Sequence, residues 1–91
     1  MAILIVRRDQ MSSAFLLINV ETGTDEVVFQ ALTKIVNIME VHLIYGNNDI
    51  IVKVEANTML ELKDIVMSIR RLDHISSTVT IVVMPEASYV K

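Results

Sequence analysis

The sequence predicts an α+β fold, in which one antiparallel sheet carries two helices in the order β-α-β-β-α-β. Three observations predict it. The polar turn Gly46–Asp49 separates two apolar runs rich in β-branched residues, a pattern typical of a β-hairpin. A stretch with helical spacing lies on each side of this hairpin. A further apolar run then flanks each helical stretch, which completes the six elements.

The first half of the chain contains a strand and a helix. Ala14–Glu21 is apolar on both alternating faces, which indicates a strand that is covered on both sides. Thr24 is a candidate N-cap, with Asp25 and Glu26 in the positive first turn of a helix over about residues 25–37. The apolar positions of this helix follow the spacing i, i+3, i+4, i+7 at Val28, Ala31, Leu32 and Ile35.

The second half repeats this order after the hairpin strands Val41–Tyr45 and Ile50–Val54. Thr58–Glu61 matches a capping box, in which the Thr and Glu side chains satisfy free backbone N–H groups. The helix that follows places Arg70-Arg71 at its negative C-terminal end. Its apolar positions are Leu62, Ile65, Val66, Ile69 and Leu72. Ser76–Met84 is then a β-branched strand that Pro85 ends.

Right-handed connections between these elements give a ferredoxin-like sheet with strand order 4-1-3-2 and both helices on one face. The first strand offers two apolar sets, Leu16/Ile18/Val20 and Phe15/Leu17, and only one of them can face the helices. The other set faces outward, and packing two sheets face to face is its simplest cover. With 53% hydrophobic residues, the composition favours such a homodimer, of the dimeric α+β barrel type.

The chain divides into a short N-terminal strand or extension (residues 1–11), one domain (residues 12–85) and a loosely ordered tail (residues 86–91). The apolar stretch Met1–Arg8 could pair with the edge of its own sheet or of a neighbour's sheet. Alternatively, Met11 is the true start of the protein and the first ten residues are not part of the native product.

Composition argues against several classes of function. The net charge is -3 with pI ≈ 5.2, and no basic stripe is present to neutralise nucleic-acid phosphates, so direct DNA binding is not expected. The sequence has no cysteine and no apolar run near the ~20 residues of a membrane span, which predicts a cytoplasmic location. His42 and His74 have no carboxylate at ligand spacing, so we expect no metal site. The converging polar groups that catalysis needs are scarce in the sequence, so we also expect no cofactor and no enzyme activity.

Two polar segments stand out, namely the turn Gly46–Asp49 and the hydroxyl-rich run Ser76–Thr80. One interpretation is structural, with a hairpin turn and a strand edge. The other is a site for a small zwitterion. In that site Asp49 would bind an ammonium group, while backbone amides and hydroxyl groups would bind a carboxylate.

Three segments resemble the effector-binding (RAM) domain of the Lrp/AsnC transcription regulators. They are Ala14–Val20, the hairpin region Val41–Ala56 and the late strand Ser77–Val83, and the resemblance spans about residues 13–84. The hairpin is the most specific of the three. The resemblance implies a ferredoxin-like fold and homodimers that join through their sheets and assemble into tetramers, octamers or decamers. It also implies amino-acid ligands at the interface between dimers.

Family members carry an N-terminal helix-turn-helix, so this chain resembles a stand-alone form that co-assembles with full-length Lrp/AsnC relatives. Residues Ile3–Arg7 are similar in place to the hinge strand of such relatives. Three positions depart from the family pattern. Asn48 replaces an aromatic residue or His, Val79 replaces a frequent Arg, and Leu72–Ile75 replaces a Pro-Gly-Val-like corner.

Together these observations predict a non-enzymatic sensing module that binds an amino acid or a related metabolite and modulates transcription. The expected ligand-binding residues are Gly46, Asn47 and Asn48 as backbone donors, Asp49 as the ammonium partner, and Ser77, Thr78 and Thr80 as hydroxyl contacts. One alternative is a small α+β barrel enzyme, similar to cofactor-free monooxygenases or lactone isomerases, in which His42 is the only candidate catalytic residue. Another is a structural oligomerisation partner without a ligand.

Overall fold

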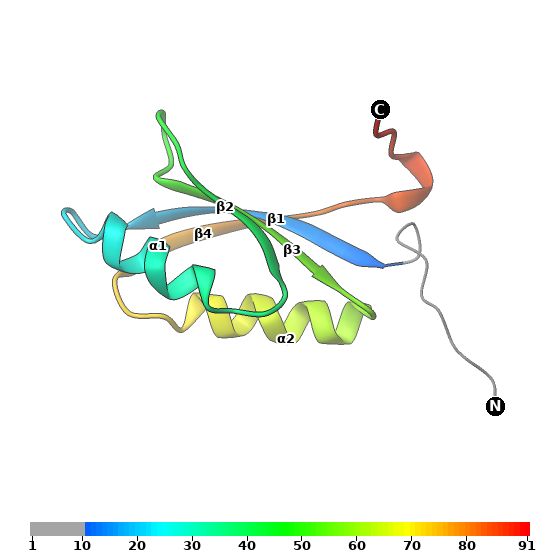
Figure 1. The fold of residues 1–91 in the computed structure, drawn as a ribbon, viewed down its shortest axis with the longest axis horizontal. Coiled ribbons are helices and arrows are strands. Elements are labelled where there is room, and N and C mark those ends of the chain that lie inside the picture. The colour runs from blue at the N-terminus through cyan, green and yellow to red at the C-terminus, as the bar shows by residue number, and fades with distance from the viewer. Residues whose placement is uncertain (1–10) are drawn as a thin grey trace.

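Four antiparallel strands form one sheet, and two helices cover one of its faces (Figure 1). The computed structural model describes residues 11–91, so the short strand predicted at residues 1–8 lies outside the described residues. The elements are β1 (Ser12–Val20), α1 (Asp25–Thr33), β2 (Ile38–Leu43), β3 (Ile50–Ala56), α2 (Met59–Arg70), β4 (Ile75–Val82) and the short 3₁₀ turn η2 (Pro85–Ala87). The sheet order β2-β3-β1-β4 confirms the predicted order 4-1-3-2, read from the other edge.

The two central strands point one apolar set at the helices and the other at the open face of the sheet. Leu16 pairs with Val52 on β3 and with Thr80 on β4, and residues paired in this way lie on the same face. This inner face is fully buried at Leu16 and Ile18, whereas Phe15 and Leu17 are only partly buried. The core contains Ala14, Leu16, Ile18, Val28, Leu32, Ile50, Val52, Val54, Ala56, Leu62, Val66 and Ile69.

The first helix is shorter than predicted, because α1 ends at Thr33 rather than near residue 37. Asn37 instead forms hydrogen bonds with β3. Its carbonyl accepts a hydrogen bond from the Glu55 N–H at 3.0 Å, and its Nδ2 donates to the Glu55 carbonyl at 3.1 Å. Thr24 occupies the N-cap position, but its hydroxyl donates to the Glu21 carbonyl at 2.6 Å, so the predicted side-chain cap is not formed.

The second helix begins where the sequence predicts, and one of the two hydrogen bonds of the predicted capping box is formed. The Thr58 hydroxyl oxygen accepts a hydrogen bond from the Glu61 N–H at 3.1 Å. The Glu61 carboxylate accepts a hydrogen bond from Asn37 Nδ2 at 3.1 Å, so a tertiary contact replaces the reciprocal bond of a capping box. The inward positions Leu62, Val66 and Ile69 are buried, as the helical spacing predicted.

The corner between α2 and β4 places a non-glycine residue in the left-handed region. His74 has φ 73°, its carbonyl accepts a hydrogen bond from the Glu21 N–H at 2.8 Å, and its Nδ1 lies 3.1 Å from Glu21 Oε2. A side chain in this region costs energy because Cβ crowds the backbone. The backbone bond to Glu21 ties this corner to the end of β1.

We expect the substitution His74→Gly to raise the free energy of unfolding by about 1 kcal/mol, since glycine adopts this φ without the Cβ penalty. For a domain of this size the melting temperature would rise by about 4–8 °C. The matched control is His74→Ala, which keeps the strained backbone and loses the exposed contact with Glu21, so its stability should not increase. A lower stability for His74→Gly than for the wild type would contradict this account.

The C-terminal segment turns away from the helices after β4. Val83 N–H still donates to the Ser13 carbonyl at 2.9 Å, and the chain then forms η2. The Ser88 hydroxyl donates to the Met84 carbonyl at 2.6 Å. Figure 1 shows the C-terminus on the side of the sheet opposite to α1 and α2. This segment therefore extends along one end of the open face.

Candidate functional site

Asp49 connects the hairpin between β2 and β3 to the end of β1 by hydrogen bonds. Its backbone N–H donates to the Ile18 carbonyl at 3.0 Å, and its Oδ2 accepts a hydrogen bond from the Val20 N–H at 2.9 Å. Its carbonyl accepts a hydrogen bond from the Ile44 N–H at 3.0 Å, which closes the turn. Asp49 thus has a structural role in addition to the binding role predicted from the sequence.

A cavity of about 280 Å³ lies beside the Asp49 carboxylate. The loop between β1 and α1 forms its other walls, with the carboxylates of Glu21 and Asp25 beside Thr22 and Gly23. The second Asp49 oxygen, Oδ1, accepts no hydrogen bond from the described residues. Three carboxylates around one small cavity favour a cationic group over an anionic one.

The other predicted site residues do not all lie near this cavity. Gly46 and Asn47 lie in the exposed hairpin turn and do not line it. Ser77 lies across β1 from Asp49 at the same end of the sheet, where its Oγ accepts a hydrogen bond from Asn19 Nδ2 at 3.3 Å. Thr78 and Thr80 point to the helix face, because they pair with the buried Ile18 and Leu16. One copy of the chain therefore does not bring the predicted hydroxyl groups together with Asp49.

The open face of the sheet carries an apolar centre that we name the outer patch. Its five side chains come from three strands, and they are Phe15, Leu17, Ile51, Val79 and Ile81. Val79 and Ile81 are about half exposed, at 54% and 50%. A contiguous apolar surface on an antiparallel sheet is typical of a face that another layer covers.

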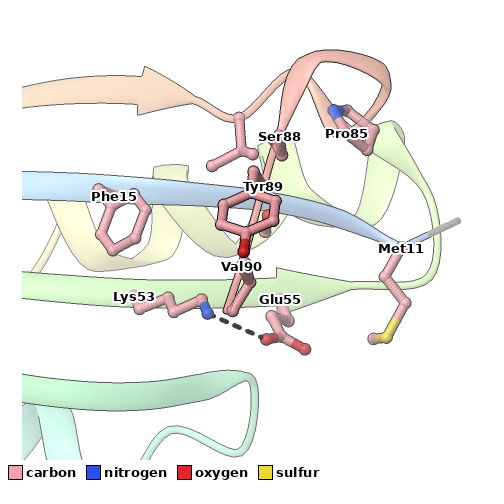
Figure 2. Close-up of a pocket in the computed structure, with 10 residues that line it drawn as sticks. Met11, Phe15, Lys53, Glu55, Pro85, Ser88, Tyr89 and Val90 are labelled. Atoms are coloured by element: carbon pink, nitrogen blue, oxygen red, sulfur yellow. Dashed lines mark ion pairs between the residues drawn. The ribbon is translucent and has the colours of Figure 1, made fainter. Parts of the chain in front are cut away.

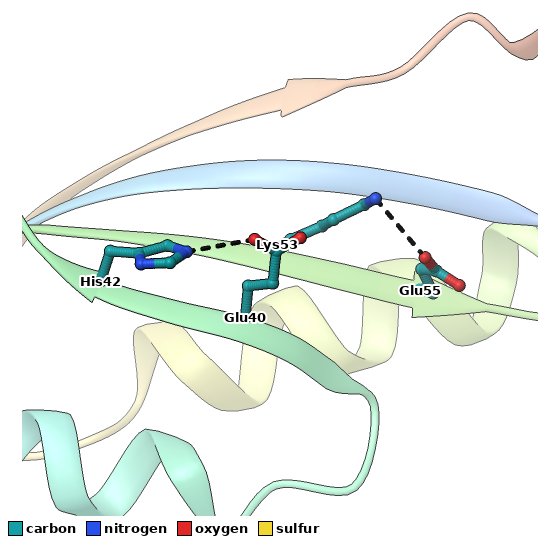
Figure 3. A network of polar contacts seen from close by, with 4 residues as sticks. All are labelled: Glu40, His42, Lys53 and Glu55. Carbon is teal, nitrogen blue, oxygen red and sulfur yellow. Dashed lines mark hydrogen bonds and ion pairs between the residues drawn. The ribbon is translucent and has the colours of Figure 1, made fainter. Parts of the chain in front are cut away.

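Charged side chains border the outer patch on the β2 side (Figure 3). His42 Nε2 lies 3.1 Å from Glu40 Oε1, and Lys53 Nζ lies 3.7 Å from Glu55 Oε1. The Lys53 ammonium also lies 5.9 Å from the centre of the Phe15 ring, within the range of a cation–π contact. His42, the candidate catalytic residue of the enzyme alternative, is on this open face with its side chain 59% exposed, so it does not lie in a pocket between the sheet and the helices.

A larger cavity of about 510 Å³ lies between the open face and the C-terminal segment. Side chains from β1, β3 and this segment surround it, including Phe15, Lys53, Glu55 and Tyr89 (Figure 2). Tyr89 is 85% exposed although it lines the cavity, so the segment does not seal the space beneath it. The cavity is continuous with the outer patch through Phe15.

Within residues 11–91 no group of three or more His, Cys, Asp or Glu side chains is arranged to hold a metal ion. The same residues contain no helix with the length and apolar character needed to span a membrane.

A family model described as the Lrp/AsnC ligand binding domain matches residues 13–89. The chain belongs to this family. Its predicted resemblance to the RAM domain and its predicted ferredoxin-like fold are thereby confirmed. The family places the chain among regulatory, ligand-binding domains. Comparison with curated proteins gives no match.

Solved structures of Lrp/AsnC-like proteins share this fold. The hypothetical protein PHS023 from Pyrococcus horikoshii is 30% identical, with a TM-score of 0.76, and the match covers 80% of this chain and 89% of that chain. FFRP-DM1 is also 30% identical, with a TM-score of 0.78 and coverage of 80% and 99%. The transcriptional regulator NMB0573 from Neisseria meningitidis, solved as a complex with L-Met, is 14% identical, with a TM-score of 0.76 and coverage of 98% and 61%. This last likeness concerns the fold alone.

Sequence reasoning missed the loop between β1 and α1 as part of the site. The sequence predicts Asp25 only as a first-turn residue of a helix, and it assigns no binding role to Thr22 and Gly23. The structure places all three beside Asp49. The acidic character of Asp25 is visible in the sequence, but the proximity of this loop to Asp49 depends on the long-range pairing of β1 with β3.

Proposed function

We propose that this chain is a regulatory sensing domain that binds an amino acid beside Asp49 and couples binding to the assembly of its copies. The observation that carries the proposal is the match of the Lrp/AsnC ligand binding domain to residues 13–89, nearly the whole chain. The complex of the Neisseria regulator with L-Met supports an amino acid as the class of ligand.

The cavity beside Asp49 suits the ammonium group of such a ligand. Asp49 Oδ2 accepts the Val20 N–H, which holds the carboxylate in place, while Oδ1 accepts no hydrogen bond from the described residues and Asp49 lines the cavity. Glu21 and Asp25 add negative charge around the same space. A charge-assisted hydrogen bond from an ammonium group to a positioned carboxylate is roughly twice as strong as a neutral one.

The carboxylate of the ligand needs hydrogen-bond donors in addition to the hydroxyl and backbone N–H groups of Thr22 and Gly23, which line this cavity. The predicted donors are the backbone amides of Gly46, Asn47 and Asn48 and the hydroxyl groups of Ser77, Thr78 and Thr80. Thr78 and Thr80 lie on the opposite face of the sheet from Ser77, so a ligand that contacts them and Asp49 must lie between copies. A ligand shared in this way stabilises the assembly that completes the site.

The outer patch supports a homodimer in which two sheets pack face to face. Phe15, Leu17 and Ile51 already lie partly buried in one copy, and a second sheet would remove the rest of their surface from water. Further assembly of such dimers, to tetramers and to octamers or decamers, would place hairpin turns beside neighbouring copies. Co-assembly with a full-length Lrp/AsnC relative would connect this response to transcription.

The test is thermal melting of the purified chain against each of the twenty amino acids, with Asp49→Asn beside the wild type. Asparagine keeps an oxygen that accepts the Val20 N–H bond but removes the negative charge. We expect an amino acid that raises the melting temperature of the wild type to have at least about tenfold lower affinity for the variant. Asp64→Asn, an exposed change on α2, is the matched control and should respond like the wild type.

Two results would contradict the proposal. If no amino acid shifts the melting temperature or the size of the assembly, the domain does not sense this class of ligand. If a ligand acts equally on the wild type and on Asp49→Asn, the ammonium site lies elsewhere. Asp49→Ala is less suitable, because losing the acceptor for a part-buried N–H costs about 1–3 kcal/mol of stability.

A further inference from the structure

A groove of about 600 Å³ runs between α2 and β4, on the face of the sheet that carries the helices. The buried side chains of Leu62 and Val66 form its floor. Its flanks are apolar and exposed, with Leu60 at 71% and Val82 at 47%. The outer patch lies on the opposite face, so a face-to-face dimer leaves this groove open.

The free edge of β4 lies along this groove. β4 is the last strand of the sheet and pairs only with β1 among the described residues. Val83 N–H donates to the Ser13 carbonyl, and hydrogen bonds in an antiparallel pair engage alternate residues. The N–H and C=O groups of Thr78, Thr80 and Val82 therefore point away from β1. The side chains of Thr80 and Val82 line the groove, so the free backbone groups and the apolar surface lie at the same place.

The groove is basic although the chain as a whole has a net charge of -3. Lys63 and Arg70 line it, and no carboxylate from residues 11–91 does. Neither cation forms an ion pair with any residue in the range 11–91. Two unpaired cations beside an apolar floor complement an acidic partner that also carries apolar side chains.

We propose that the α2–β4 groove binds an acidic, extended segment of a partner protein, which adds to the sheet as a strand beside β4. Strand addition supplies main-chain hydrogen bonds at the edge, and pockets for alternate side chains give selectivity. The twelve residues of α2 span about 18 Å, which matches a strand of about five or six residues. In such a segment alternate apolar side chains face α2, and acidic residues near its ends face Lys63 and Arg70. This proposal does not depend on Asp49, but it shares Thr78 and Thr80 with the hydroxyl contacts proposed for the amino-acid ligand.

The first experiment measures the binding of a labelled peptide, Glu-Thr-Ile-Thr-Ile-Thr-Glu, to the full chain by fluorescence anisotropy. A peptide with Lys in place of both Glu residues is the matched control and should not bind. Lys63→Glu should weaken binding of the acidic peptide about fivefold, because it replaces an attraction by a repulsion, and added salt should reduce this difference. Lys34→Glu, an exposed change beyond the end of α1, should alter the affinity less than about twofold.

The second experiment distinguishes strand addition from binding to the groove alone. Amide hydrogen exchange followed by NMR should slow at Thr78, Thr80 and Val82 when the acidic peptide binds, because these N–H groups become donors. Equal binding of the acidic and basic peptides, or unchanged exchange at these three amides, would overturn the proposal. A smaller assembly for Leu60→Glu without any peptide would also overturn it, since the groove would then be an interface between copies.

Discussion

Replacing Leu17 with glutamate is expected to dissociate the assembled protein into folded monomers of 10.3 kDa. Leu17 lies at the centre of the outer patch, paired with Ile51 on one side and Val79 on the other. In a face-to-face dimer this position is removed from water in both copies. A carboxylate there would be buried among apolar side chains, and burying a charged group in this way costs several kcal/mol in each copy. Sedimentation analysis measures the mass, and circular dichroism checks that the fold is retained.

The control for Leu17→Glu is Val36→Glu, which places the same charge at a residue that is 88% exposed in the connection between α1 and β2. This variant should assemble like the wild type. A wild-type protein that sediments as a monomer, or a Leu17→Glu variant that keeps its assembled mass, would rule out the outer patch as the dimer interface.

The neighbouring substitution Leu16→Ala is expected to have the largest effect on folding. Leu16 is fully buried on the inner face, and leucine-to-alanine changes in such positions cost about 3–5 kcal/mol, because a cavity remains. A domain of this size has about 5–13 kcal/mol of stability in total. The melting temperature should therefore fall by more than about 12 °C.

Urea denaturation of Leu16→Ala should be measured in the Leu17→Glu background, so that association does not contribute to the stability. The matched control is Val79→Ala in the same background. Val79 is 54% exposed on the outer patch, so its truncation should cost about 1 kcal/mol or less. Equal losses for the two variants would contradict the assignment of the inner and outer faces of the sheet.

Most of the contacts that form the candidate site could not be predicted from local sequence patterns. The sequence correctly marked Asp49 as a residue of a tight polar turn, since Gly46–Asp49 can adopt turn conformations without strain. It did not reveal that Asp49 accepts a hydrogen bond from Val20, which is 29 positions earlier in the chain. It also grouped Ser77, Thr78 and Thr80, which the alternation of β4 divides between two faces. Contacts between particular residues of distant segments depend on the register in which the strands pair, and the local pattern alone does not fix this register.

The sequence by itself determined the type and order of the elements and the strand order of the sheet. Helical spacing, turn residues and right-handed connections are local or chiral constraints, and they leave few topologies open. The inward residues of α2 followed from the same spacing, at Leu62, Val66 and Ile69.

Only the tertiary structure decided which face of β1 is the core. Leu16 and Leu17 are the same residue type on opposite faces of β1, so the sequence pattern is compatible with either face being directed at the helices. Packing against Val28, Leu32 and the buried side of α2 fixes Leu16 inward. The end of α1 was decided in the same way, because Asn37 gains hydrogen bonds to Glu55 and Glu61 that a longer helix would forfeit. In both cases contacts between distant segments decided the outcome, because the local sequence pattern left the face of β1 open and favoured a longer α1. Such contacts exist only in the folded chain.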